Sequence, residues 1–292
     1  MPDPAEFEER EDLSEAEQQR MSEGIRLKAA LVHEIIREEG EEELARSTSA
    51  LAWSGLAAGL SMGFSLVVEG LLHHYLPEAE WRPLVASFGY TTGFVIVVLG
   101  RQQLFTENTL TGVIPLLTRR DPATALALAR LWGVVLLANL VGAALFAALA
   151  SHAPIFEPNL HEDFLAIGQA AAAGGFLVLL IKAVLAGWLI GLMVWLLPGA
   201  GSARLIVILL ITYIVALGGF SHIIAGSVDV LYLVFSGEKS FLSYLIDFVV
   251  PVLIGNIIGG SALVAMLNHA QVRGEVPAVA AADEEAADQP LS

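Results

Sequence analysis

Seven ionisable side chains interrupt stretches of sequence that are otherwise almost wholly apolar, and through them this chain could do chemistry. They are Glu69, Arg101, Glu107, Lys182, His222, Asp229 and Asp247. A charged group is costly in an apolar environment, so each such residue is a functional candidate unless it is paired for structural reasons. His222 is the strongest candidate, because an imidazole can exchange a proton near neutral pH or donate a hydrogen bond to an anion. The alternative is a histidine held by backbone carbonyl groups.

Two interruptions, rich in polar residues and glycine, surround the most informative of these side chains. His222 lies in the interruption at 218–227, and Arg101 and Glu107 flank the other, at 100–108. The arginine and the glutamate could pair with each other or with a neighbouring stretch, or they could select the charge of a solute.

The remaining basic groups divide between the interior and the edge of the apolar stretches. Lys182 lies deep within one stretch, where it could attract an anion or neutralise Asp247 or Glu69. His73 and His74 fall at an edge, which favours an interfacial role over a chemical one.

Composition excludes several classes of protein. The chain of 292 residues is 55% hydrophobic and 16% charged, which is unlike a soluble enzyme. Its 31 acidic against 15 basic residues argue against a nucleic-acid partner, and the absence of cysteine excludes disulfides and thiolate chemistry. No hydrolase, zinc-protease or phosphate-loop signature is present. The sequence therefore predicts no enzyme, no metal site and no cofactor.

Six apolar stretches, each near or above the length that crosses a bilayer, organise the chain. The second and the fifth contain the two interruptions. The stretches are Leu51–Leu76, Arg82–Leu117, Ala123–Ser151, Phe164–Leu197, Ala203–Phe235 and Phe241–Asn268. Lys and Arg concentrate at the N-terminus and in the connections after the second and fourth stretches. This bias predicts an inner-membrane protein with six transmembrane helices and both termini in the cytoplasm.

A weak internal repeat relates the two halves of the apolar region. Asn139-Leu-Val-Gly-Ala resembles Asn256-Ile-Ile-Gly-Gly, and the interruptions beginning at Gly100 and Gly218 have nearly the same offset. Because each unit has three crossings, consecutive units have opposite orientations in the membrane. The sequence thus predicts an all-α membrane protein with an inverted repeat and broken second and fifth helices, enclosing a pore for a small solute.

Two acidic segments flank the predicted transmembrane domain, which spans 48–270. Residues 1–47 predict an amphipathic cytoplasmic helix, with Ser14 and Glu17 as a capping box. Residues 271–292 have the composition of a disordered tail.

Five short stretches, in order along residues 50–268, resemble the formate/nitrite transporter family. They are Leu104-Phe105-Thr106, Asn139-Leu140-Val141-Gly142-Ala143, Leu192-Met193-Val194-Trp195, Gly219-Phe220-Ser221-His222 with Ala225, and Gly255-Asn256-Ile257-Ile258-Gly259-Gly260. The resemblance implies an aquaporin-like protomer, a homopentamer with one pathway per protomer, and passage of small monovalent anions such as formate or nitrite, with a proton supplied through or near the histidine.

The same resemblance assigns positions along the transport pathway. It implies that His222 faces Thr106 at its centre. Tyr90, Phe94, Leu104 and Val215 would narrow the pathway, and Phe105 would also line it.

Several positions depart from the family pattern. The basic residue expected near the start of the fourth helix is replaced by Gly-Gln-Ala-Ala-Ala-Ala at 168–173, a role that Lys182 could take over. Glu107 adds a carboxylate beside Thr106, which would repel anions unless Arg101 pairs with it. Two alternatives to an anion pathway therefore stay open. One is a pore or exporter for neutral or cationic solutes, selected by Glu107 and Asp247, and the other is a closed scaffold acting through its acidic N-terminal helix.

Overall fold

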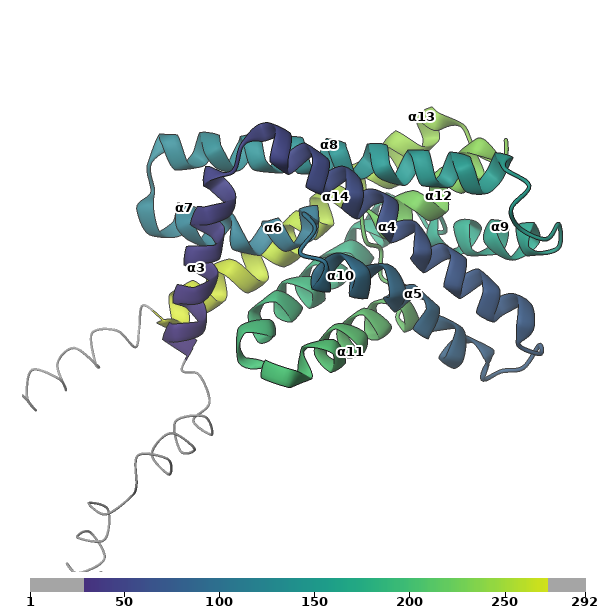
Figure 1. Cartoon of the computed structure of the whole chain (residues 1–292), viewed down its shortest axis with the longest axis horizontal. Coiled ribbons are helices and arrows are strands. Elements are labelled where there is room, and N and C mark those ends of the chain that lie inside the picture. The colour runs from purple at the N-terminus through teal and green to yellow at the C-terminus, as the bar shows by residue number, and fades with distance from the viewer. Residues whose placement is uncertain (1–28, 273–292) are drawn as a thin grey trace, which may run out of the picture.

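The computed structural model describes residues 29–272, and every regular element in that part of the chain is a helix (Figure 1). The first half comprises α3 (Ala29–Ala45), α4 (Thr48–Tyr75), α5 (Arg82–Leu99), α6 (Phe105–Thr111), α7 (Val113–Arg119) and α8 (Pro122–His152). The second half comprises α9 (Leu160–Ala171), α10 (Phe176–Leu196), η1 (Leu197–Gly199), η2 (Gly201–Ala203), α11 (Arg204–Leu217), α12 (Ala225–Phe235), α13 (Phe241–Ser243), η3 (Tyr244–Val249), α14 (Val250–Ile257) and η4 (Ile258–Met266).

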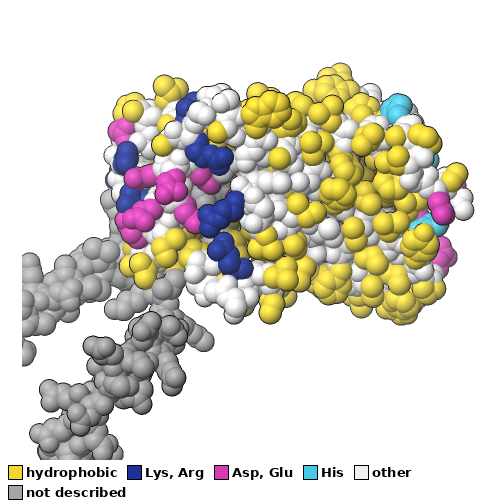
Figure 2. Space-filling view, in the orientation of Figure 1, with side chains coloured by type: hydrophobic (Ala, Val, Ile, Leu, Met, Phe, Trp, Pro, Cys, Tyr) yellow, Lys and Arg dark blue, Asp and Glu magenta, His cyan; other side chains and the backbone are white. Residues whose placement is uncertain are grey.

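Many large hydrophobic side chains are exposed along the helices, as expected for a protein embedded in lipid. In Figure 2, charged side chains gather at the end formed by α3 and α7, and hydrophobic side chains cover most of the rest of the visible face. Five helices of the described part are long and apolar enough to cross a membrane. The remaining crossing consists of two shorter helices, α11 and α12. The prediction of an all-α protein with six crossings is confirmed.

Both predicted interruptions are real breaks between helices. The helix α5 ends at Leu99, and the chain then runs through Arg101, which has φ 50°, to the start of α6. In the second half α11 ends at Leu217, and Gly219, with φ 59°, occupies the corresponding position. A positive φ is strained for arginine but not for glycine. The turn is therefore the same in both halves, and only the second half has the residue that suits it.

Asn139 of α8 fixes the first break by three hydrogen bonds. Its side-chain oxygen accepts from the backbone N–H of Phe105 at 2.9 Å. Its amide nitrogen donates to the carbonyl of Gln103 at 2.9 Å and to that of Gly55, on α4, at 2.7 Å. Backbone polar groups inside a membrane need such partners, because no water is available to replace them.

Asn256 of α14 does the same in the second half. Its oxygen accepts from the N–H of Ile223 at 2.8 Å, and its amide donates to the carbonyls of Ser221 at 2.9 Å and Ala183, on α10, at 2.8 Å. The three partners have the same relation to the second break as those of the other asparagine have to the first. The two halves of the inverted repeat therefore hold their breaks with equivalent sets of hydrogen bonds.

The fourth predicted stretch, Phe164–Leu197, is not one helix. It divides into α9, which ends at Ala171, and α10, which begins at Phe176, with Gly174 at φ 113° between them. The alanine-rich segment at 168–173 conceals this boundary, since alanine favours helix and only the glycine pair that follows marks the turn. The first part, α9, is a short helix that packs against α12 and α4.

The helix α3 lies against its own chain. It packs on α7, α8 and α6, with Val32 and Ile36 buried (Figure 1). His33 also reaches the other described end of the chain, since its Nε2 lies 2.9 Å from Nδ1 of His269. The N-terminal and C-terminal ends of the described chain therefore lie at one end of the molecule. The predicted capping box at Ser14 lies outside the described residues.

Candidate functional site

The two breaks bring Thr106 and His222 together at the centre of the protein. Thr106 is the second residue of α6, and His222 lies in the loop before α12. Thr106 Oγ1 is 2.7 Å from His222 Nε2, and the two residues are 0% and 1% exposed. The pair expected from the resemblance is thus in direct contact.

The surrounding backbone fixes which nitrogen of His222 carries the proton. Nδ1 accepts from the N–H groups of Ile224 and Ala225, each at 3.2 Å, at the N-terminus of α12. A nitrogen that accepts two hydrogen bonds has no proton of its own, so in the neutral ring the proton lies on Nε2. His222 therefore donates to Thr106. A second proton on Nδ1 would oppose these two N–H groups and the positive end of the helix dipole.

The Thr106 hydroxyl is left as a donor without a protein acceptor. Its oxygen accepts from His222, and no acceptor for its hydrogen is found among residues 29–272. A hydroxyl that accepts one hydrogen bond is polarised to donate another. The pair can therefore present an O–H group to an oxygen of a passing solute.

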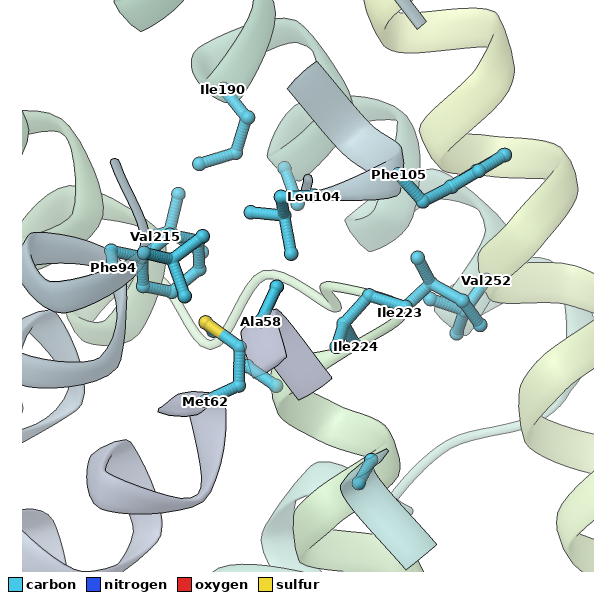
Figure 3. Packing of buried hydrophobic residues seen from close by; sticks show 14 of the residues in the cluster. Ala58, Met62, Phe94, Leu104, Phe105, Ile190, Val215, Ile223, Ile224 and Val252 are labelled. Carbon is cyan, nitrogen blue, oxygen red and sulfur yellow. The ribbon is translucent and has the colours of Figure 1, made fainter. Parts of the chain in front are cut away.

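Apolar side chains enclose this polar pair. Phe94, from α5, makes an edge contact with the His222 ring, with centroids 4.9 Å apart, and Tyr90 lies 5.3 Å from Phe94. Leu104 and Val215 belong to the same buried cluster as Phe94 (Figure 3), and both are fully buried. Phe105 points away from this group and packs on Trp132 of α8, with centroids 5.8 Å apart (Figure 3). Its ring therefore belongs to the packing between α6 and α8.

One cavity, here called the α9-end cavity, opens on one side of the pair and reaches His222. It has a volume of about 220 Å³ and is lined by α4, α5, α9, α12 and the second break. Its polar lining includes Glu69, Tyr90, Ser221, His222 and Asp229. Among residues 29–272 no lysine or arginine lines it, so the cavity has an acidic character.

A second cavity, here called the α3-end cavity, lies on the other side and has a volume of about 210 Å³. Its charged lining mixes both signs. The charged residues are Glu39, Glu42, Glu43, Arg46, Arg101, Glu107 and Arg204.

Sequence reasoning missed the contribution of α3 to this second cavity. The Glu43 carboxylate accepts from Thr111 Oγ1 at 2.7 Å and from Gln103 Nε2 at 3.2 Å. Burial raises the pKa of Glu43, and these two hydrogen bonds oppose the rise. The signal in the sequence was only a run of glutamates, which resembles any solvated helix.

The charged side chains of the spans do not pair with one another. Arg101 and Glu107 line the same cavity but form no ion pair in the described structure, and Glu107 Oε1 is buried without a hydrogen-bond partner. The pairing of these two residues, one of the alternatives that the sequence left open, is therefore not formed in the described structure, and the Arg101 side chain is exposed.

Lys182 and Asp247 also stand apart. Lys182 Nζ lies 3.8 Å from the position that a Cβ atom on Gly219 would occupy, at the rim of the α9-end cavity. Within residues 29–272 it forms no ion pair, so it neutralises neither Glu69 nor Asp247. Asp247 accepts from Ser243 Oγ on the outside of the protomer.

Comparison with known proteins is consistent with this architecture. The family model described as formate/nitrite transporter matches residues 30–270. The inner membrane protein YfdC of Escherichia coli (strain K12) is 43% identical over 249 residues, which cover 85% of this chain and 80% of that protein. The formate channel BtFdhC of Bacillus thuringiensis is 27% identical, over 80% of this chain and 91% of its own.

Solved structures agree on the fold. A pentameric formate channel with formate bound superposes with a TM-score of 0.60 at 22% identity, over 79% of this chain and 96% of that one. An ion channel of the FNT family superposes with a TM-score of 0.62 at 19% identity, over 82% of this chain and 94% of that one. The neighbours are channels and transporters, not enzymes, and the helices and the match to an inner membrane protein support a multi-pass location there. The chain belongs to the formate/nitrite transporter family.

Proposed function

We propose that this protein is a channel or proton-coupled transporter for small monovalent anions of weak acids, such as formate or nitrite. The hydrogen-bonded Thr106 and His222, enclosed by apolar side chains between two cavities, carry this proposal. The formate channels among the relatives support the substrate class.

The apolar enclosure demands that the solute cross it without charge. Stripping water from a small carboxylate between Phe94, Leu104 and Val215 costs on the order of several kcal/mol. A proton on the anion removes that cost. Thr106 and His222 then orient the neutral acid, because the hydroxyl donates to its oxygen while the imidazole stays neutral and holds α12.

The assembly and orientation belong to the same proposal. Large hydrophobic side chains remain exposed along the spans, including Leu137, Val141 and Leu145 on α8 and Phe176 and Ile181 on α10. A homopentamer in a bilayer would cover these faces with neighbouring subunits and lipid. The basic residues in the connections support an orientation with both termini, and with them α3, in the cytoplasm.

Flux measurements with His222→Asn test the proposal. The Asn oxygen can still accept from the N–H groups of α12, whereas the Nε2–H that polarises Thr106 is lost. Wild type in proteoliposomes should take up formate or nitrite, and the variant should do so roughly tenfold more slowly at every pH. A correctly assembled variant with wild-type flux would contradict the role of the pair, and a wild type that moves neither anion would contradict the substrate class.

One observation favours a second candidate, a pore for neutral or cationic solutes. Glu107 Oε1 is buried without a partner beside the α3-end cavity, and an ionised carboxylate there would repel anions. The Glu107→Gln variant separates the two. If wild type carries no anion and this variant does, Glu107 is a selectivity barrier and the natural solute is neutral or cationic.

A further inference from the structure

Asp229 is buried in the wall of the α9-end cavity with no group to neutralise it. It lies on the second turn of α12 and is 6% exposed. Within residues 29–272 its carboxyl group makes no hydrogen bond and no ion pair. A buried ionised carboxylate without a partner is strongly destabilised. The carboxyl group of Asp229 is therefore expected either to be protonated or to interact with a solute that enters the cavity.

Glu69 of α4 faces the same cavity and likewise has no ion pair in the described structure. Both carboxyl groups line this one cavity, and no lysine or arginine of the described chain lines it with them. Like charges that share an apolar site do not both ionise readily, so the pair tends to keep at least one proton. An anion enters this cavity most easily when the pair is protonated, because two ionised carboxylates would repel it.

His222 is poorly placed to be the proton carrier itself. Its Nδ1 accepts two backbone N–H groups, and its Nε2–H is donated to Thr106. Taking up a proton would break the first two of these bonds. Both ring nitrogens of His222 are therefore already hydrogen-bonded, whereas the carboxyl groups in the cavity wall are free to exchange a proton.

We propose that Asp229 and Glu69 form a proton-loading site in the α9-end cavity, which protonates the anion before it reaches Thr106 and His222. A carboxyl O–H transfers its proton to formate and gives formic acid and a carboxylate. That carboxylate regains a proton from water on the same side of the membrane, and the acid releases its own to water beyond the α3-end cavity. This inference rests on the proposed function and names the groups that couple the proton to the anion.

The other titratable and charged groups around Asp229 are few. None of them neutralises its carboxyl group by an ion pair. They are Glu69 and His73 on α4, Tyr90 on α5, His161 and Asp163 on α9, His222 in the second break, Tyr232 on α12 itself, Tyr244 on η3, and Lys182 at the cavity rim. His161 binds the Tyr232 hydroxyl at 2.5 Å, and Tyr244 donates to Ser227. His161, Tyr232 and Tyr244 therefore have hydrogen-bond partners of their own, and Asp163 contacts His74. Glu69 and Asp229 are the carboxyl groups among the residues that line the cavity, which makes them the proton carriers in this proposal.

Paired measurements of formate and proton uptake into proteoliposomes test the site. Wild type should take up about one proton with each formate, faster as the pH falls. In Asp229→Asn, which has nearly the same shape, the ratio of acid to alkaline rates should fall by roughly tenfold, as expected when one titrating group is lost. Glu69→Gln should shift the profile in the same direction. Glu162→Gln, an exposed carboxylate at the same end of the molecule, serves as the control.

Three outcomes overturn the inference. The first is an Asp229→Asn protein with the wild-type pH profile and proton ratio. The second is a wild type that carries methylammonium and loses this with Asp229→Asn while formate flux stays unchanged, because the carboxylates then form a cation site. The third is an infrared difference spectrum between acid and alkaline pH that lacks a protonated-carboxyl signal removed by Asp229→Asn. The spectrum needs no transport, so it still decides if wild type moves no formate and the proposed function fails.

Discussion

Thr106 and His222 are 116 residues apart in the chain, yet their side chains meet at 2.7 Å in the middle of the molecule. Each lies where a helix restarts after a break, and each break belongs to a different half of an inverted repeat. The contact therefore forms only if the two breaks lie at the same level within the molecule. It is also polarised, because the backbone of α12 occupies His222 Nδ1 and leaves Nε2–H for the threonine.

Removing the hydroxyl of Thr106 should slow transport. Thr106→Val keeps the shape of the side chain but leaves the buried Nε2–H of His222 without an acceptor, at a cost of about 1–3 kcal/mol. The flux of formate through the assembled protein should fall by roughly tenfold or more. Thr106→Ser retains the hydroxyl and should stay near wild type. Equal flux in the valine and serine variants would show that the hydroxyl takes no part.

The two asparagines that fix the breaks should contribute equally to stability. Asn139→Leu and Asn256→Leu each strand three backbone groups, every one of which costs about 1–3 kcal/mol if left unsatisfied. Both variants should lower the thermal unfolding temperature in detergent by similar amounts. Asn159→Ala, at an exposed position before α9, should have no effect. A large loss from only one of the two would show that the halves are not held in the same way.

Glycines beside these asparagines should not tolerate a methyl group. A Cβ atom on Gly59 would lie 2.2 Å from the backbone oxygen of Asn139, and one on Gly187 would lie 2.4 Å from that of Asn256. Gly59→Ala and Gly187→Ala should therefore separate the helices and lower the yield of assembled protein. Gly199→Ala is the control, since nothing lies within 4 Å of its Cβ position and it lies outside the long helices, and it should be neutral. Normal assembly of both test variants would contradict the close packing.

The docking of α3 should weaken in acid. Burial, and then the charge of His269, lower the pKa of His33 below its ordinary value of 6.5. A base whose pKa is lowered by folding stabilises the docked helix above pH 6.5 and loses that contribution as the pH falls through and below this value. Hydrogen exchange of residues 29–45, corrected for intrinsic rates, should therefore show less protection in acid.

The matched variant for this test is His33→Gln, which keeps hydrogen-bonding groups but cannot titrate. It should remove most of the dependence on pH, whereas His152→Gln, at an exposed position on α8, should leave it unchanged. Identical acid-induced exchange in wild type and His33→Gln would assign the effect to other groups.

The sequence predicted the repeat and the breaks because apolar spans tolerate polar residues and glycine only where the backbone needs them. Asn139 and Asn256 begin the two short motifs that revealed the repeat. The boundary between α9 and α10 was missed, since alanine and leucine continue a helical pattern straight up to Gly174. Hydropathy measures where apolar residues lie, and it does not distinguish one long helix from two short ones.

The electrostatics of the site were harder to predict. Arg101 and Glu107 are close in sequence and opposite in charge, which favours a pair, but in the described structure they line one cavity without forming an ion pair. Asp229 and Glu69 come from helices far apart in the chain, and only the fold shows that they share one cavity. The role of α3 could not be predicted for the same reason. A run of glutamates is typical of a solvated helix, and only the fold shows that Glu43 accepts a hydrogen bond from Thr111.

The most direct test of the account is a comparison of solutes in the wild-type protein. Labelled formate and labelled methylammonium would be offered to the same proteoliposomes, at equal gradients and over a range of pH. We expect formate uptake that rises as the pH falls, together with methylammonium uptake no faster than in empty liposomes. Uptake of methylammonium without any uptake of formate would contradict the account, because the carboxylates at both cavities would then select cations.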